Sequence, residues 1–223
     1  MPIDVTKYET KEAMLAAMEG RLREALAKLD EHPFAIMISG GSTPLPVYGA
    51  LAKEPPAVSP NAGILFADDR YVPADSPESN YGNALPMIQG LGIPAGRTLR
   101  IHPELPLEEA AERYNKDLRA FLTAGGSIPL AFLGLGADGH TCSLFNDGDL
   151  ERCSGKLAAA IYKDSPPDRI TVSPELLSRV GHIIFVVAGD DKIEMIKALV
   201  EHPESITAGK AVARCRSVEL WQS

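Results

Sequence analysis

Apolar side chains recur along the chain with two different periods, and the two periods alternate. Over residues 9–29 they return every three or four positions, which is the period of an amphipathic helix, and Thr10 stands where an N-terminal cap belongs. The stretch 34–38 is then continuously apolar and is followed shortly by two glycines. A short unbroken apolar run of this kind is typical of a strand that is buried on both faces of a parallel sheet.

The alternation continues to the end of the chain, and it defines the expected fold. Thr43 and Pro44 predict the start of a second helix, as its cap and its first helical residue. Strands that alternate with helices are typical of a largely parallel, doubly wound sheet with helices on both faces. We therefore expect residues 1–223 to form a single three-layer α/β/α domain with a modified Rossmann-like topology. Further helices are expected over 80–89, 107–124 and 190–202, and further strands over 64–66, 128–136, 158–163, 169–173, 182–190 and 211–220.

Composition and charge limit the classes of molecule that this chain is expected to bind. At 45% apolar residues the 223-residue chain can bury a substantial core, and its formal net charge of −8 comes without any basic run. Nucleic acid and anionic membranes are therefore poor partners, and no apolar stretch approaches the ~20 residues needed to span a bilayer. Three unevenly spaced cysteines without a C-x-x-C motif indicate neither a disulfide framework nor a zinc ribbon, so a reduced, cytoplasmic compartment is expected.

Unusual residues gather where three of the expected strands end. These stretches are "SGGSTP" at 39–44, "DDRYVP" at 68–73, which we expect to be a charged loop, and "GLGADGH" at 134–140. In open α/β sheets, ligands bind beyond the carboxyl ends of the strands. The candidate site is therefore sought in these three segments.

The glycines of 134–140 match the spacing of the dinucleotide fingerprint G-x-G-x-x-G, yet their neighbours argue against a nicotinamide cofactor. Asp138 would place a negative charge against the pyrophosphate, and the acid expected about 20 residues later is at best Asp164. An Asp and a His two residues apart on a glycine-rich loop point instead to acid–base chemistry, with His140 as general base and Asp138 orienting its ring. The alternative is that Asp138 caps a turn and that His140 is merely exposed.

The "SGGSTP" stretch offers groups that bind an anion. Gly40 and Gly41 allow close approach of the backbone, Ser42 and Thr43 add hydroxyl donors, and free amides at a helix N-terminus attract negative charge. No Gly-Lys-Ser/Thr follows, so the segment is not a P-loop and a nucleoside triphosphate is not expected. A monophosphate fits this stretch, and an ordinary capped turn is the alternative.

An acidic protein that binds an anionic small molecule needs a local cluster of basic side chains. Three basic residues lie at the ends of expected strands and helices. Arg70 follows a buried strand, Arg169 begins an expected strand, and Lys192 opens an expected helix. An arginine presents a fork of N–H groups that matches a phosphate. The alternative for Arg70 is an ion pair with Asp68 or Asp69, and the other two cations have an ordinary surface role as their alternative.

Other candidate sites are not supported by their spacing. The five histidines show neither H-x-x-x-H nor H-x-H, so no metal site is expected. Cys142 lies close to the candidate base but is expected to be a small packing residue. Ser143 lacks the G-x-S-x-G elbow of a nucleophile.

Taken together, these segments resemble those of one family, the 6-phosphogluconolactonases, within the wider group that includes the glucosamine-6-phosphate deaminases. The matching stretches occur in the family's order between residues 39 and 192, and the long combination "LGLGADGHTCSLF" at 133–145 is specific. The other matching stretches are "SGGSTP", "DDRYVP" with "SPESNYGNA", "DRITVSPELL" and "FVVAGDDK".

The resemblance implies hydrolysis of 6-phospho-D-glucono-1,5-lactone to 6-phosphogluconate in the oxidative pentose phosphate pathway, with no organic cofactor and no catalytic metal. It assigns His140 as the general base and Asp138 as its supporting acid. It further implies that Arg70, Arg169 and Lys192 hold the phosphate, while the "SGGST" loop lines the pocket. A phosphosugar lactone is then the expected partner, and the chain is expected to be a monomer or a weak homodimer.

The chain departs from the family at a few positions. Asp69 stands where the family usually has Glu, which leaves the role of that carboxylate open. The deaminases share the D-G-H loop but continue with a Glu that works in ring opening, and its absence here favours the lactonase. A deaminase/isomerase stays open as an alternative, as does a non-catalytic sugar-phosphate-binding domain. That domain normally follows a DNA-binding helix-turn-helix, for which the segment before the first strand is too short.

Overall fold

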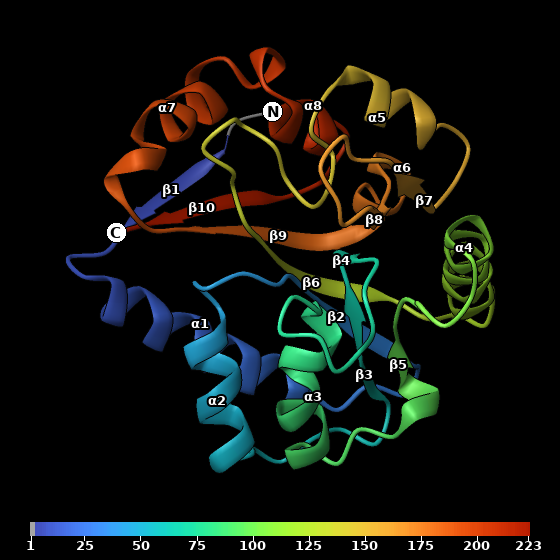
Figure 1. The fold of residues 1–223 in the computed structure, drawn as a ribbon. Coiled ribbons are helices and arrows are strands. Elements are labelled where there is room, and N and C mark those ends of the chain that lie inside the picture. The colour runs from blue at the N-terminus through green and yellow to red at the C-terminus, as the bar shows by residue number, and fades with distance from the viewer. Residues whose placement is uncertain (1–2) are drawn as a thin grey trace.

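A seven-stranded sheet forms the centre of the computed structural model, which describes residues 3–223 (Figure 1). Its strand order is β1-β10-β9-β6-β2-β3-β5, and every neighbouring pair runs parallel. The sequence prediction of a largely parallel sheet is thereby confirmed. The strands are β1 Asp4–Lys7, β2 Phe34–Ile38, β3 Ala62–Phe66, β5 Thr98–Leu99, β6 Ile128–Leu133, β9 Val180–Val187 and β10 Val218–Gln222.

Helices cover both faces of this sheet, as Figure 1 shows, and the three-layer α/β/α arrangement is therefore confirmed. Neither layer contains a helix that is long and apolar enough to cross a membrane, in the part of the chain that the structure describes. One face carries α1 Lys11–Ala27, α2 Leu45–Lys53 and α3 Asn80–Gly90. The other carries α4 Leu107–Thr123, α5 Asp147–Arg152, α6 Pro174–Leu177, α7 Ile193–Glu201 and α8 Thr207–Val212.

The central strands are continuously apolar because both of their faces are buried. In β6, Leu130 and Phe132 belong to the core beneath α1–α3, whereas Ala131 and Leu133 belong to the core on the opposite face. Successive side chains of a strand point to opposite faces, so a strand between two helical layers needs apolar residues at every position.

Three further strands form a separate antiparallel sheet, and here the sequence prediction needs correction. The order is β4 (Asp68–Arg70), β8 (Arg169–Val172) and β7 (Ala158–Ile161). The strands expected over 158–163 and 169–173 exist, but they lie outside the central sheet. Residues 68–70, expected as loop, form β4 because they pair with β8, a partner about 100 positions away that no local pattern reveals.

The chain leaves the middle of the central sheet in two directions, and this creates the crevice that holds the site. From β2 it continues to β3 and β5 on one side, and from the adjacent β6 it continues to β9 and β10 on the other. The segments that follow two neighbouring strands thus depart in opposite directions. Ligands bind at such switch points, beyond the carboxyl ends of the strands.

Near the ends of the chain, one expected strand has the wrong bounds and one strand was not expected. The strand expected over 211–220 is wrong in its first half, since α8 ends at Val212 and β10 begins only at Val218. The small residues of α8 allow it to pack closely, and a Cβ on Gly209 would lie 2.0 Å from the carbonyl oxygen of Pro203. The pattern also gave no sign of β1, whose four residues are mostly exposed and are held by pairing with β10.

Of the two N-terminal helix caps that the sequence predicts, at Thr10 and at Thr43, the first is confirmed and the second is wrong. The hydroxyl of Thr10 accepts a hydrogen bond of 3.1 Å from the N–H of Ala13, which confirms the predicted cap of α1. After α4, Gly125 has a φ of +84°, the left-handed conformation typical of a helix C-terminus. The prediction that Thr43 caps α2 is wrong, because the helix begins at Leu45 and Pro44, already in helical conformation, stands at the cap position without a side-chain hydrogen bond.

The phenol of Tyr114 donates a hydrogen bond of 2.5 Å to the main-chain carbonyl of Phe66, and Tyr114 is fully buried in α4. We expect Tyr114→Phe to lower the free energy of unfolding by about 1–3 kcal/mol, because it leaves a buried carbonyl without its donor. Chemical denaturation followed by circular dichroism measures the change. Tyr162→Phe is the matched control, since that hydroxyl bonds to Glu108 at the exposed surface, and equal losses in both variants would contradict the prediction.

Candidate active site

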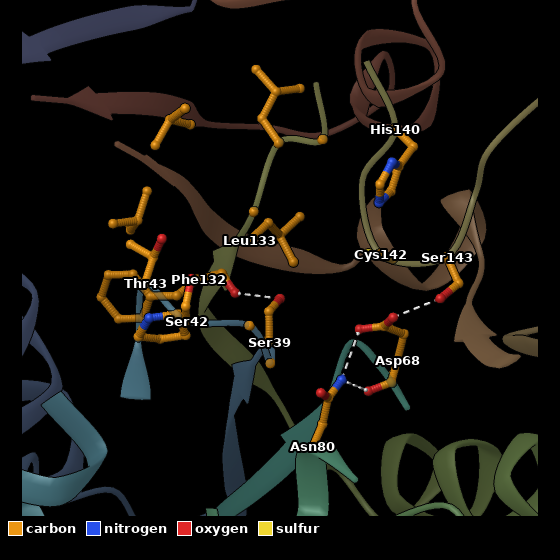
Figure 2. Close-up of a pocket in the computed structure, with 18 of the residues that line it drawn as sticks. Ser39, Ser42, Thr43, Asp68, Asn80, Phe132, Leu133, His140, Cys142 and Ser143 are labelled. Atoms are coloured by element: carbon orange, nitrogen blue, oxygen red, sulfur yellow. Dashed lines mark hydrogen bonds between the residues drawn. The ribbon is translucent and has the colours of Figure 1, made fainter. Parts of the chain in front are cut away.

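A cavity of about 380 Å³ opens beyond the carboxyl ends of β2, β6 and β9 (Figure 2). It lies at the switch point of the sheet, and it brings together segments that are distant in the sequence. Asp138, the predicted supporting acid, is an exposed side chain that does not line the cavity but contacts His140, which does. The other predicted site residues that line the cavity are Gly40, Gly41, Ser42, Thr43, Arg70, His140, Arg169 and Lys192.

His140 is hydrogen-bonded at one ring nitrogen and free at the other. Its Nδ1 pairs with Oδ1 of Asp138, while Nε2 has no hydrogen-bond partner within residues 3–223. Figure 2 shows the ring directed into the cavity. Partial burial works against the charged form of Asp138, but the hydrogen bond and the charge of His140 outweigh it and hold the pKa of Asp138 below its usual value. The hydrogen bond to Asp138 at Nδ1 thus leaves Nε2 of His140 available to a molecule in the cavity.

The glycines of the loop let the His140 side chain fold back over its own backbone. The N–H of Gly136 donates a hydrogen bond of 2.8 Å to the carbonyl of His140, and a Cβ on Gly136 would lie 2.2 Å from His140 Nδ1. Gly139 has a φ of +81°, a conformation that other residues rarely adopt. The G-x-G-x-x-G spacing thus serves the placement of an imidazole, and not the approach of a dinucleotide.

Two arginines face each other across the small sheet. The register of β4 and β8 pairs Arg70 with Arg169, and both side chains are half-buried at the cavity wall. Among residues 3–223, neither guanidinium forms an ion pair with a carboxylate; they donate to main-chain carbonyls and to Asn80 Oδ1. Burial, and then the charge of Arg70, hold the pKa of Arg169 below its usual value. The pair is therefore a concentration of positive charge that an anion would relieve.

The two carboxylates beside Arg70 bind other partners, which explains the missing ion pair. Asp68 accepts a hydrogen bond of 2.6 Å from the hydroxyl of Ser143. Asp69 accepts hydrogen bonds from the main-chain N–H groups of Arg70, Asn80 and Tyr81, at the N-terminus of α3. Burial raises the pKa of Asp69 to about 6, against the effect of these donors. The alternative in which Arg70 merely pairs with its acidic neighbours is not what the structure contains.

Lys192 and the "SGGST" loop complete the polar lining. Lys192 ends the 3₁₀ turn Asp190–Lys192 that follows β9, and its Nζ lies 3.2 Å from Oδ2 of the exposed Asp191. In the loop after β2, a Cβ on Gly40 would lie 1.7 Å from Oδ1 of Asn80, so only glycine fits there. The loop therefore packs closely against Asn80, whose Oδ1 also accepts a hydrogen bond from Arg70.

Sequence reasoning missed three polar residues of the cavity wall, Asp68, Asn80 and Ser143 (Figure 2). Asp68 is 8% exposed, and Asn80 donates a hydrogen bond of 3.0 Å to its main-chain carbonyl. The "DDR" stretch drew attention to Asp68 without giving it a role. Ser143 and Asn80 lie in two of the stretches that resemble the family, "LGLGADGHTCSLF" and "SPESNYGNA", but the local sequence gives neither of them a role.

Cys142 has the packing role that the sequence indicated. Cys142 packs against the core, and burial, together with nearby Asp68, raises the pKa of its thiol well above the usual value. A thiol in that state is a poor nucleophile. Residues 3–223 contain no group of three or more His, Cys, Asp or Glu side chains arranged to hold a metal ion.

Known proteins are similar in sequence to this chain over most of its length. A family model described as "Glucosamine-6-phosphate isomerases/6-phosphogluconolactonase" matches residues 7–220. The 6-phosphogluconolactonase of Homo sapiens is 41% identical over 186 residues, which are 77% of this chain and 70% of that protein. The 6-phosphogluconolactonase of Thermotoga maritima is 30% identical over 188 residues, which are 81% of this chain and 82% of that protein.

The fold is shared as well. The crystal structure of a 6-phosphogluconolactonase from Thermotoga maritima superposes with a TM-score of 0.79 over 99% of this chain and 100% of that one, at 24% identity. The sequence match extends over all the segments that line the cavity. On this basis, the chain belongs to the glucosamine-6-phosphate isomerase/6-phosphogluconolactonase family.

Proposed function

We propose that this chain hydrolyses 6-phospho-D-glucono-1,5-lactone to 6-phosphogluconate in the oxidative pentose phosphate pathway. The observation that carries the proposal is that one cavity holds both an imidazole and two guanidinium groups; among the described residues, Nε2 of the imidazole has no hydrogen-bond partner and the guanidinium groups have no carboxylate partner. A base and an anion site in one cavity fit a substrate with an electrophilic carbon at one end and a phosphate at the other. The relatives' names support the same activity.

Binding is assigned to the cations and the glycine-rich loop. The phosphate would accept hydrogen bonds from Arg70 and Arg169, with Lys192 adding charge, and would replace the repulsion between the two guanidinium groups by attraction. Ser42 and Thr43 would add hydroxyl donors at the loop. Fixing the remote phosphate orients the ring, so that C1 is held near His140 and the reaction gains from positioning.

The chemical step is assigned to His140 and Asp138. Nε2 of His140 takes a proton from a water molecule as that water's oxygen bonds to C1, and the C1 carbonyl becomes an oxyanion. When the oxyanion collapses, the bond from C1 to the ring oxygen breaks, and the imidazolium returns its proton to that oxygen. Asp138 keeps Nδ1 protonated and stabilises the positive charge that the ring carries between the two steps.

Several expectations from the sequence accompany this proposal and stay predictions. Residues 1–223 act as a single sugar-phosphate lactonase domain, as a monomer or a weak homodimer in the cytoplasm. The reaction uses neither an organic cofactor nor a metal, since water, an imidazole and cations suffice for each step described.

The assignment of the base is tested by hydrolysis of freshly prepared lactone in a pH-stat, with the spontaneous rate subtracted. We expect His140→Ala to lower kcat by about 10²–10⁴-fold, because the attacking water loses its base. Asp138→Asn should lower kcat by a smaller factor, since the ring keeps a hydrogen-bond acceptor but loses the charge that stabilises the imidazolium. Wild-type turnover by His140→Ala would remove His140 from the mechanism. Ammonia release from glucosamine 6-phosphate would instead reveal the deaminase.

The loop geometry gives a second prediction. We expect Gly136→Ala to lower kcat by about 10²-fold with little change in melting temperature, because the new methyl group would displace the ring of His140 by about 1 Å. Steady-state kinetics and thermal melts measure the two quantities. Gly49→Ala in α2 is the control, since its Cβ meets no atom within 4 Å. An active Gly136→Ala variant would show that the observed ring position is not the productive one.

The anion site is tested by comparing two substrates. We expect Arg169→Gln to lower kcat/KM for the phosphorylated lactone by about 10–100-fold, because a charge-assisted hydrogen bond to the phosphate is lost. For unphosphorylated glucono-1,5-lactone, kcat/KM should stay the same. Arg113→Gln, at the exposed surface of α4, controls for the loss of charge. Equal losses on both lactones would place Arg169 away from the phosphate.

A further inference from the structure

Three side chains form a stack beside the cavity. The Nζ of Lys163 lies 3.5 Å from the centre of the Phe145 ring, over its face. The Phe145 ring in turn lies 4.6 Å from the ring of His140, centre to centre, at an angle of 46°. Phe145 lines the cavity, whereas Lys163 stands outside it. The Phe145 ring therefore contacts both the ammonium group of Lys163 and the ring of the candidate base.

The segments that carry Lys163 and Phe145 are both held by main-chain hydrogen bonds. The N–H of Lys163 donates a hydrogen bond of 2.8 Å to Asp168, and the main-chain carbonyl of Asp168 accepts one of 2.8 Å from Tyr71. On the other side, the N–H of Phe145 donates a hydrogen bond of 2.9 Å to Asp149, in the first turn of α5. The contact between ammonium and ring thus joins two anchored segments.

The charge of Lys163 is free to act on the ring. In the described range 3–223, no carboxylate forms an ion pair with its ammonium group. The face of an aromatic ring carries partial negative charge and attracts a cation, most strongly where water is partly excluded. Lys163 is half-buried, so this attraction holds the Phe145 ring in place.

We propose that Lys163 is a positioning residue that acts through Phe145 on His140; this inference rests on the proposed function. The hydrogen bond to Asp138 fixes the His140 ring at Nδ1 only, and the ring can still tilt about that contact. Phe145 limits the tilt from the ring's face, and Lys163 keeps Phe145 there. The two contacts together hold Nε2 toward the cavity, where the attacking water is placed.

The rival role for Lys163 is direct contact with the substrate's phosphate. The two roles differ in kinetics, because a lost phosphate contact raises KM, whereas a loosened base lowers kcat at nearly constant KM. They also differ in their dependence on Phe145. Only the positioning role requires that the effects of changing Lys163 and Phe145 be coupled.

The test uses Lys163→Met, Lys163→Arg, Phe145→Leu and the double variant Lys163→Met/Phe145→Leu, with Lys156→Met as the control. Lys156 is an exposed lysine in the turn before β7, and its loss removes the same charge. We expect Lys163→Met to lower kcat about 3- to 20-fold at nearly constant KM, and Lys163→Arg to retain activity, since arginine also stacks on aromatic rings. The double variant should be as slow as Phe145→Leu alone, and Lys156→Met should match wild type.

A measurement without substrate separates this inference from the proposed function. The ring current of Phe145 shifts the ring proton resonances of His140 in an NMR spectrum, and their assignment comes from the His140→Gln variant. We expect Lys163→Met, but not Lys156→Met, to move these resonances. If they move while the wild-type protein fails to hydrolyse the lactone, the proposed function falls and the positioning contact stands. If they stay, or if kinetic effects in the double variant are additive, the inference is overturned.

Discussion

The site depends on two guanidinium groups that the fold places without a carboxylate partner among residues 3–223. Antiparallel pairing of β4 with β8 sets Arg70 opposite Arg169, and the acids next to Arg70 are engaged elsewhere: Asp68 with Ser143, and Asp69 with the N-terminus of α3. Burial, and then the like charge of Arg70, lower the pKa of Arg169. In the proposed function, an anion in the cavity would replace the repulsion between the two arginines by attraction. A protein of net charge −8 would in this way bind an anionic molecule.

The other end of the cavity depends on close approach and not on charge. His140 folds back over a loop in which Gly136 leaves room for the ring, and Asp138 and Phe145 hold that ring from its edge and its face. A general base must stand within hydrogen-bond reach of the proton that it takes, so its orientation matters as much as its identity. In the proposed function the two ends of the cavity perform different tasks, and the switch point between β2 and β6 brings them together.

The fold class and the candidate site could be inferred from local patterns because these patterns have local causes. Buried parallel strands are apolar at every position, which marked β2 and β6, and glycine-rich turns mark places where a backbone must come close to something. The predictions failed where the cause was distant. Residues 68–70 become a strand only because residues 169–172 lie beside them. The strand expected over 211–220 began too early, because the small apolar residues at the end of α8 suit either element.

The sequence by itself determined the alternation of strands and helices, the three strand ends that carry polar residues, and the residue types proposed as base, supporting acid and cations. Only the tertiary structure decided that Arg70 faces Arg169, that Ser143 donates a hydrogen bond to Asp68, and that Phe145 contacts both Lys163 and His140. The physical reason is that strand register and side-chain contact between distant segments follow from how the layers pack. A residue's local neighbours record its preference for an element, but not which distant charge or ring will come to lie beside it.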